Sequence, residues 1–284
     1  MDLGFHIANF TWDVPDDQLA PTLAKAAAQA EASGIKRITV MDHFWQIDTI
    51  GNPEQPMLEG YTALGFIAAH TQSVLLHTLV SGVIYREPGI LAKQISTLDV
   101  LSGGRAGLGI GAAWNEQESN GLGIPFPPVK ERFERLEETL QICLQMWSDD
   151  ERPYDGKHYQ LGRTLNSPQN LSKPRPYLMI GGVGEQKTLR FVARYADACN
   201  IFGSPEAAHK LDVLRHWCEV EDRDYDTIEK TTTTAIAADT DLDEFVGRLD
   251  ALRELGFTAA YVSARTPDPL HAVEFLGKVV ERVA

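Results

Sequence analysis

The sequence predicts an α/β protein, more narrowly a (β/α)8 barrel, from two observations. Short apolar or β-branched runs alternate with longer runs of helical period, and the alternation repeats eight times. The 284 residues, 43% of them hydrophobic, suffice for eight such units around one large core. A doubly wound open sheet is the alternative, but the first expected strand leads into residues 8–13 without a glycine-rich phosphate turn. We therefore expect a single domain over residues 1–284.

The expected elements cover the whole chain in order. Strands are expected at 2–8, 36–41, 74–81, 105–110, 177–181, 197–202, 231–238 and 258–263. Helices are expected at 16–33, 60–72, 88–101, 129–147, 185–196, 205–220, 241–255 and 268–282. Residues 148–176 are too long, and too often interrupted by proline and glycine, for a simple connection. They are expected to form an insertion over one end of the barrel.

Residues 98–118 place a helix end, a turn, a strand and a glycine-rich loop in direct succession. Leu98, Val100 and Leu101 would finish an apolar helical face, and the Ser-Gly-Gly at 102–104 would end that helix. Residues 106–111 are typical of a strand buried on both sides. The loop that follows would lie at the carboxyl end of a strand, where parallel sheets bind ligands.

Composition narrows the classes of partner. The net charge of −14 argues against nucleic acid and anionic membranes, because both attract basic surfaces, so a small-molecule substrate is expected. No apolar run reaches the roughly 20 residues that cross a bilayer, and the start lacks a signal-peptide pattern, so a cytoplasmic location is expected. Cys143, Cys199 and Cys218 are widely spaced and are expected to pack in the core, with no disulfide or metal site.

The first candidate site is at the end of the second expected strand. His43 can donate or accept a proton near neutral pH, and Asp42 could orient it or cap a helix. Phe44 and Trp45 could form the wall of an apolar pocket for a planar ligand. The alternative for His43 is a hydrogen-bonded surface histidine.

The third expected strand ends in a second candidate segment, residues 77–88. Its small residues would let the backbone approach a flat ring, next to Tyr85. Arg86 could bind an anion or a carboxylate there, or pair structurally with Glu87 or another acid.

Residues 178–188 form a third candidate segment, in which Gly181, Gly182 and Gly184 separate a strand from a helix. Lys187 is expected in the first turn of that helix. Exposed backbone N–H groups, the helix dipole and a lysine together favour a phosphate site. A tight turn that needs glycine for its geometry alone is the alternative.

Four ordered motifs carry a resemblance to a known family. They are Asp42-His43-Phe44 and the segments 97–116, 125–133 and 180–185. Together they resemble the bacterial luciferase-like oxidoreductases, and more narrowly the branch that uses the deazaflavin coenzyme F420. The resemblance implies a TIM barrel that holds the coenzyme at the carboxyl ends of its strands, with FMN as the alternative cofactor.

The resemblance also implies site residues. His43 would be the proton partner with Asp42 beside it, and Leu79–Val80 would form a non-prolyl cis peptide behind the coenzyme ring. The residues implied in cofactor binding are Asp42, His43, Leu79, Val80, Ser81, Gly109, Gly111, Ala112, Asn115, Gly181, Gly182, Val183 and Gly184. The expected substrate pocket consists of Phe44, Trp45, Tyr85 and Trp114.

One departure from the family pattern bears on the substrate. Sugar-phosphate dehydrogenases of this family carry a glutamate acid after the fourth-strand glycines, where Trp114 is the nearest equivalent here. This puts glucose-6-phosphate oxidation in doubt and favours a flatter or more apolar substrate, although Glu116 or Glu118 could substitute as the acid.

The resulting expectation is hydride transfer between F420 and an unidentified small organic substrate. An FMN-dependent monooxygenase that incorporates molecular oxygen is the alternative, and a non-catalytic flavin-binding protein is the third interpretation. Apolar helix stripes and the resemblance also predict a homodimer.

Overall fold

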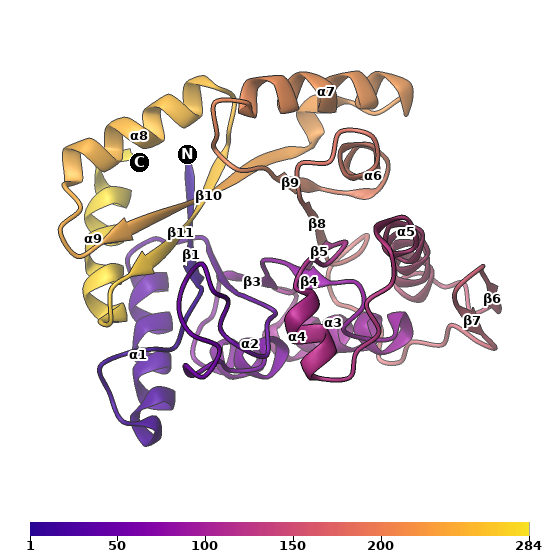
Figure 1. Ribbon diagram of the computed structural model, residues 1–284, viewed down its shortest axis with the longest axis horizontal. Coiled ribbons are helices and arrows are strands. Elements are labelled where there is room, and N and C mark those ends of the chain that lie inside the picture. The colour runs from indigo at the N-terminus through magenta and orange to yellow at the C-terminus, as the bar shows by residue number, and fades with distance from the viewer. Residues whose placement is uncertain (284) are drawn as a thin grey trace.

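The computed structural model, which describes residues 1–283, is built on a parallel sheet that curls into a nearly closed barrel (Figure 1). The strand order is β3-β2-β1-β11-β10-β9-β8-β5-β4. The strands are β1 (Asp2–Ile7), β2 (Arg37–Val40), β3 (Leu75–Thr78), β4 (Ser81–Gly82), β5 (Gly107–Gly111), β8 (Tyr177–Gly181), β9 (Ala198–Asn200), β10 (Glu229–Ala237) and β11 (Ala259–Arg265). A parallel bridge between Leu76 and Ala106 joins β3 to β5. The predicted TIM barrel is confirmed.

The third expected strand is interrupted, which is why nine strands replace the expected eight. β3 and β4 are separated by the Leu79–Val80 peptide, which is cis, as the resemblance implies. Next to this break the backbones approach closely, because a Cβ on Gly109 would lie 2.0 Å from the carbonyl oxygen of Thr78. Only glycine fits there.

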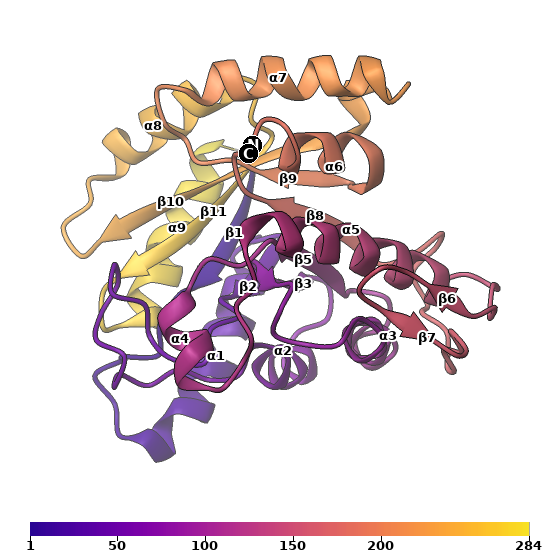
Figure 2. The same ribbon diagram turned by 45° about the vertical axis from the view of Figure 1, so that its right-hand side comes forward.

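Helices surround the strands (Figure 2). They are α1 (Leu19–Ala32), α2 (Gly60–Ala69), α3 (Pro88–Ser102), α4 (Glu116–Gly121), α5 (Val129–Met146), α6 (Thr188–Tyr195), α7 (Ala207–Val220), α8 (Leu242–Glu254) and α9 (Pro269–Val283), with short 3-10 turns at Asp16–Gln18 and Tyr225–Thr227. The sequence did not predict α4. Gly103, with φ of 73°, ends α3 as expected, but Leu101 is 73% exposed, so its assignment to the apolar face was wrong.

The expected insertion at 148–176 is present between α5 and β8. It carries the antiparallel pair β6 (Tyr154–Asp155) and β7 (Gln160–Leu161), seen at the far right of Figure 1. Glu138 of α5 accepts hydrogen bonds from the backbone amides of residues 157–159, and Glu134 binds the side chains of Lys157 and His158, so two carboxylates hold the tip of the pair against the helix.

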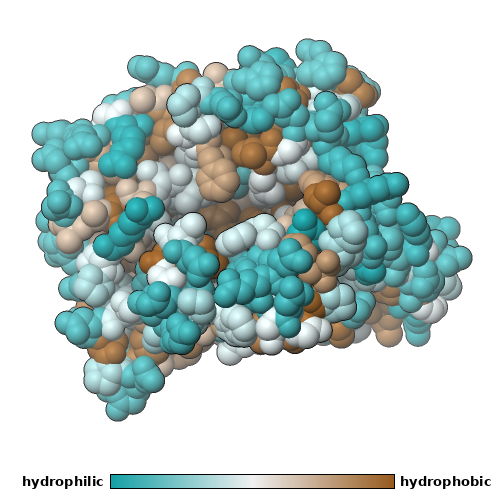
Figure 3. Space-filling model, viewed as in Figure 1, coloured by the Kyte–Doolittle hydropathy of each residue, from teal (hydrophilic) through white to brown (hydrophobic). Residues whose placement is uncertain are grey.

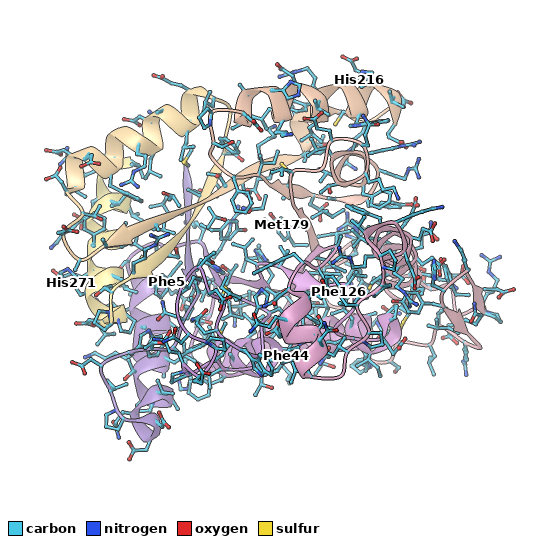
Figure 4. The ribbon with its side chains drawn as sticks, viewed as in Figure 1. Phe5, Phe44, Phe126, Met179, His216 and His271 are labelled. Atoms are coloured by element: carbon cyan, nitrogen blue, oxygen red, sulfur yellow. The ribbon has the colours of Figure 1, made fainter. Side chains whose placement is uncertain are left out.

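Two hydrophobic clusters make up the core. The larger lies between strands and helices and includes Phe5, whereas a small cluster with Met179 and Tyr261 is separate from it; Figure 4 labels Phe5 and Met179. All three cysteines are buried and unpaired, as predicted. No helix within residues 1–283 has the length and hydrophobicity to cross a membrane.

A largely buried polar cluster, here called the lower cluster, occupies the barrel near the amino ends of the strands. It consists of Arg37, His77, Tyr177, Glu229 and Tyr261. Arg37 donates from both terminal nitrogens to Glu229, and Tyr177 Oη donates to the same carboxylate at 2.7 Å. Tyr261 Oη accepts from Arg37 and donates to His77 Nε2 at 2.8 Å. Every charged group of the cluster therefore has a partner inside the fold.

Candidate functional site

A cavity of about 780 Å³ lies at the carboxyl ends of the strands. It opens on the face shown in Figure 3, where the surface is hollowed near its centre. Ten of the residues predicted for the site line it, namely His43, Leu79, Val80, Ser81, Tyr85, Gly111, Ala112, Trp114, Gly181 and Gly182. The structure does not bring Asp42, Phe44, Trp45, Gly109, Asn115, Val183 or Gly184 to the cavity wall.

His43 lies in the wall and is held by a carboxylate. Its Nδ1 is 2.8 Å from Oε2 of Glu118, which α4 carries. The ring of Trp114 contacts His43 edge-on, with 5.4 Å between the ring centroids. Since Nδ1 is engaged by Glu118, Nε2 is the ring nitrogen left for the cavity.

Glu118 is buried, with 1% of its surface exposed, and four donors surround its carboxylate. The amides of Phe44 and Trp45 donate to Oε1 at 2.6 and 2.9 Å, and Tyr85 Oη donates to Oε2 at 2.6 Å beside His43. Burial alone would raise the pKa of Glu118, but the hydrogen bonds from His43, Tyr85 and the Trp45 amide bring it below its ordinary value. An ionised Glu118 accepts from His43, so the proton on Nδ1 is fixed.

The structure decides what Asp42 and Arg86 bind, for which the sequence left alternatives open. Asp42 does not orient His43, because its carboxylate pairs with Arg86 at 2.5 and 2.9 Å and is 1% exposed. Arg86 also binds Glu59, whose side chain caps α2, and it lies over the ring of Tyr61. The alternative in which Arg86 pairs structurally with an acid is thus the observed one, although the acid is Asp42 rather than Glu87.

The structure also bears on whether Glu118 or Glu116 could substitute as the acid that acts on the substrate. All four hydrogen bonds of Glu118 come from the protein, which leaves no oxygen turned to the cavity. Glu116 is exposed and is not part of the cavity wall. Neither carboxylate is placed to give a proton to a molecule in the cavity.

Bare backbone and one valine form the rear wall of the cavity. A Cβ on Gly181 would lie 3.0 Å from both methyl groups of Val80, and one on Gly111 would lie 3.2 Å from Val80. The two glycines therefore leave the space that Val80 occupies, and the three residues together present a largely apolar surface. Such a surface suits the face of a flat ring.

The predicted phosphate segment lies at the start of α6. The helix begins at Thr188, so Lys187 is its N-cap rather than a first-turn residue, which corrects the predicted boundary at 185. Gly182 has a φ of 125°, and Thr188 lies against Gly182 and Gly184 on the cavity side. The Lys187 ammonium lies 5.4 Å from the ring centroid of Phe133, which lines the cavity. A helix N-terminus and a hydroxyl thus lie at this end of the cavity, and the Lys187 ammonium lies against Phe133 without being part of the wall.

Trp45 has a different place from the predicted one. A Cβ on Gly121 of α4 would lie 2.0 Å from the Trp45 ring, so the indole packs directly on the helix rather than into the cavity. Figure 4 likewise labels Phe44 next to α4. Asn115 caps α4, because its Oδ1 accepts from the Glu118 amide at 3.1 Å. These contacts position Glu118, the functional residue whose bond to His43 sequence reasoning missed; the Asn-x-x-Glu spacing of a capped helix was its only local signal.

Comparisons with known proteins give further findings. An uncharacterized protein of Mycobacterium tuberculosis is 31% identical over 189 residues, 62% of this chain, and the chain spans 66% of that relative's length. An F420-dependent glucose-6-phosphate dehydrogenase of Kineococcus radiotolerans is 29% identical over 280 residues, covering 94% of this chain and 79% of the relative.

Solved structures share the fold at low sequence identity. An F420-dependent secondary alcohol dehydrogenase, in complex with an F420-acetone adduct, superposes with a TM-score of 0.85 at 16% identity, covering 100% of this chain and 99% of the other. The monooxygenase RslO1 from Streptomyces bottropensis superposes with a TM-score of 0.83 at 16% identity, covering 100% of both chains. The family model described as luciferase-like monooxygenase matches residues 1–278. With its barrel, its cavity at the strand ends and this match over nearly all of its length, the chain belongs to the luciferase-like monooxygenase family.

Proposed function

We propose that this protein is an F420-dependent oxidoreductase that transfers a hydride between the coenzyme and a small organic substrate. The observation that carries the proposal is the pairing of a flat, glycine-backed wall with a histidine whose Nε2 faces the same cavity. Relatives and structural neighbours described as F420-dependent support the choice of coenzyme.

The residues present fit a deazaflavin. Gly111 and Gly181 leave room for the Val80 side chain, and the ring would lie against the wall that these three residues form. The phosphate would lie near Thr188 and Lys187, at the N-terminus of α6. When bound, the deazaflavin supplies a carbon that accepts or gives a hydride.

The protein's own residues position groups and handle the proton. Glu118 fixes hydrogen on Nδ1 of His43, so Nε2 can take a proton from a substrate hydroxyl or return one to a carbonyl. Trp114 and Tyr85 flank the imidazole and keep its ring in one orientation. The expected cis peptide is present, but the cofactor roles of the wall residues stay part of this proposal.

Titration of the coenzyme-free protein with F420 and, separately, with FMN tests the proposal. Binding of F420 with a change in its fluorescence, and weaker binding of FMN, is the expected result. Preference for FMN would instead support the monooxygenase alternative, which the family description and RslO1 also represent. If neither binds, the proposal fails.

His43→Ala tests the proton role with F420 bound. Turnover should fall by about 100- to 10,000-fold while F420 affinity stays within about threefold, because general acid–base catalysis is lost and the cradle is kept. His216→Ala, on the outer helix α7, is the control and should leave both unchanged. Unchanged turnover in His43→Ala would remove the proton role from His43. The small-molecule substrate and the homodimer both stay predictions. Analytical ultracentrifugation would test the homodimer.

A further inference from the structure

Building on the proposed function, we propose that the substrate is an uncharged molecule with a mainly hydrocarbon body, rather than a sugar phosphate. The observation is a ring of exposed apolar side chains at the mouth of the cavity. Ile50, Trp114, Val129 and Phe202 all line it, with 41, 61, 56 and 64% of their surfaces exposed. We call these four residues the mouth ring.

The mouth ring comes from four separate parts of the chain. Ile50 follows β2, Trp114 follows β5, Val129 begins α5 and Phe202 follows β9. Large exposed apolar side chains that converge on one opening mark a binding surface rather than ordinary surface variation. Figure 3 shows hydrophobic residues at the margin of the hollow.

Charge inside the cavity is sparse on the side of His43. His6 lines the cavity, but burial lowers its pKa to about 4 against the raising effect of its hydrogen bond to Thr39, so it is neutral at physiological pH. Burial and the Glu118 carboxylate raise the pKa of Tyr85, which is therefore also neutral. Arg86 faces Asp42 and Glu59 and is not part of the wall.

The remaining cations do not form a second phosphate site. Arg132 is held by the carbonyl of Ala113 at 3.1 Å and stacks on Phe126 at 4.1 Å. Arg265 lines the cavity from the end of β11 and its side chain is exposed. Recognition of a phosphate dianion requires several convergent N–H donors, and one rim guanidinium supplies too few. The Lys187 end is the part of the cavity already assigned to the coenzyme.

An apolar body would gain affinity at the mouth ring by removing hydrocarbon surface from water. Each buried methylene is expected to raise affinity about fourfold when it is fully enclosed. A carbonyl oxygen at the inner end of such a substrate could then lie near His43. Glu118 fixes the hydrogen on Nδ1 of this histidine, which leaves Nε2 to handle the proton. Substrate size and hydrophobicity should thus determine affinity, and negative charge should not increase it.

Ligand-observed NMR with cyclic ketones from cyclopentanone to cyclooctanone, and with glucose 6-phosphate, tests the inference. The series is measured on F420-loaded protein and on coenzyme-free protein, after F420 affinity has been determined by fluorescence. We expect ketone affinity to rise about twofold to fourfold per added methylene and glucose 6-phosphate not to compete. Flat ketone affinities, or competition by glucose 6-phosphate, would overturn the inference.

Two matched variants locate the effect. Trp114→Ala should flatten the dependence on ring size and weaken cyclooctanone binding about tenfold, while F420 affinity stays within threefold. Leu101→Ala removes another exposed apolar side chain, on the outer helix α3, and should change neither. Equal effects of both variants would also overturn the inference. Failure of F420 to bind would reject the proposed function alone, because the ketone series on coenzyme-free protein still reports on the cavity.

Discussion

The two ends of the barrel interior each hold a glutamate among several donors, yet they differ in whether the neighbouring histidine keeps a ring nitrogen free of protein partners. In the lower cluster, Glu229 accepts from Arg37 and Tyr177, and the neighbouring His77 has both ring nitrogens bonded within the protein. At the cavity, Glu118 accepts from His43 and Tyr85, and His43 keeps one nitrogen for the cavity.

The difference shows that similar groups can be fully enclosed at one end of a barrel and can leave a ring nitrogen open to a cavity at the other. Burial raises the pKa of both glutamates, and donated hydrogen bonds reverse the effect, so both pKa values fall below the ordinary one. Where every partner is internal, the network only stabilises the barrel. Where one ring nitrogen is left open next to a cavity, the network can move a proton.

Arg37→Met should have the largest effect, because it leaves Glu229 without its cation. We expect a loss of about 3 kcal/mol in the free energy of unfolding, measured by urea denaturation. Arg152→Met is the control, since that guanidinium pairs with Asp150 at the surface with its side chain 84% exposed, and it should cost at most about 0.5 kcal/mol. Similar losses in both variants would show that the lower cluster contributes no more than a surface pair.

His77 should make stability depend on pH. Burial lowers its pKa to about 3, partly opposed by the hydrogen bond to the Thr78 carbonyl, whereas the unfolded chain takes up the proton near pH 6.5. Between these values only the unfolded state binds the proton, so stability falls as the pH falls, by about 1.4 kcal/mol per pH unit.

His77→Gln removes this titration and keeps a side-chain amide for Tyr261. Urea denaturation at several pH values between 4.5 and 6 should therefore give a slope about 1.4 kcal/mol per pH unit shallower than in the wild type, whatever the absolute stability. The same slope in both proteins would mean that His77 is protonated in the folded state.

Glu118→Gln should lower turnover roughly 10- to 100-fold, as expected when the group that orients a functional histidine is replaced. Nitrogen NMR shifts should show His43 losing its fixed hydrogen on Nδ1, a change that a purely structural role would not produce. Glu116→Gln, two residues earlier and exposed, is the control. A fixed Nδ1 hydrogen in Glu118→Gln would assign the orientation to another group.

Tyr85→Phe at the cavity and Tyr177→Phe in the lower cluster each remove one hydroxyl that donates to a glutamate. Each hydroxyl donates to a glutamate carboxylate, at 2.6 and 2.7 Å, so each variant should lose about 1.5 kcal/mol in the free energy of unfolding. Only Tyr85→Phe should also reduce turnover, by a few fold, when unfolding and steady-state rates are compared. Equal turnover in the two variants would separate Tyr85 from the chemistry.

Buried strands and long amphipathic helices were predictable because their periodicity is local. α4 was not, because its five polar residues and one glycine contain no apolar period, and its place is set by Asn115 and by Trp45 packing on Gly121. The pairing of His43 with Glu118 spans 75 residues, beyond any local signal. Asp42 was the partner that the sequence offered, but its carboxylate is taken by Arg86, 44 residues away along the chain.

The small helix α4 has a consequence for how such proteins diversify. Trp114, which lines the cavity, lies four residues before Glu118, which binds the imidazole of His43, and Asn115 between them caps the helix. If the proposed function holds, descendants can exchange the residue at 114 and acquire new substrates while keeping the pair of His43 and Glu118 unchanged. Lineages that insert or delete a residue between 115 and 118 would lose both at once, so length should vary less in this loop than its amino-acid identity.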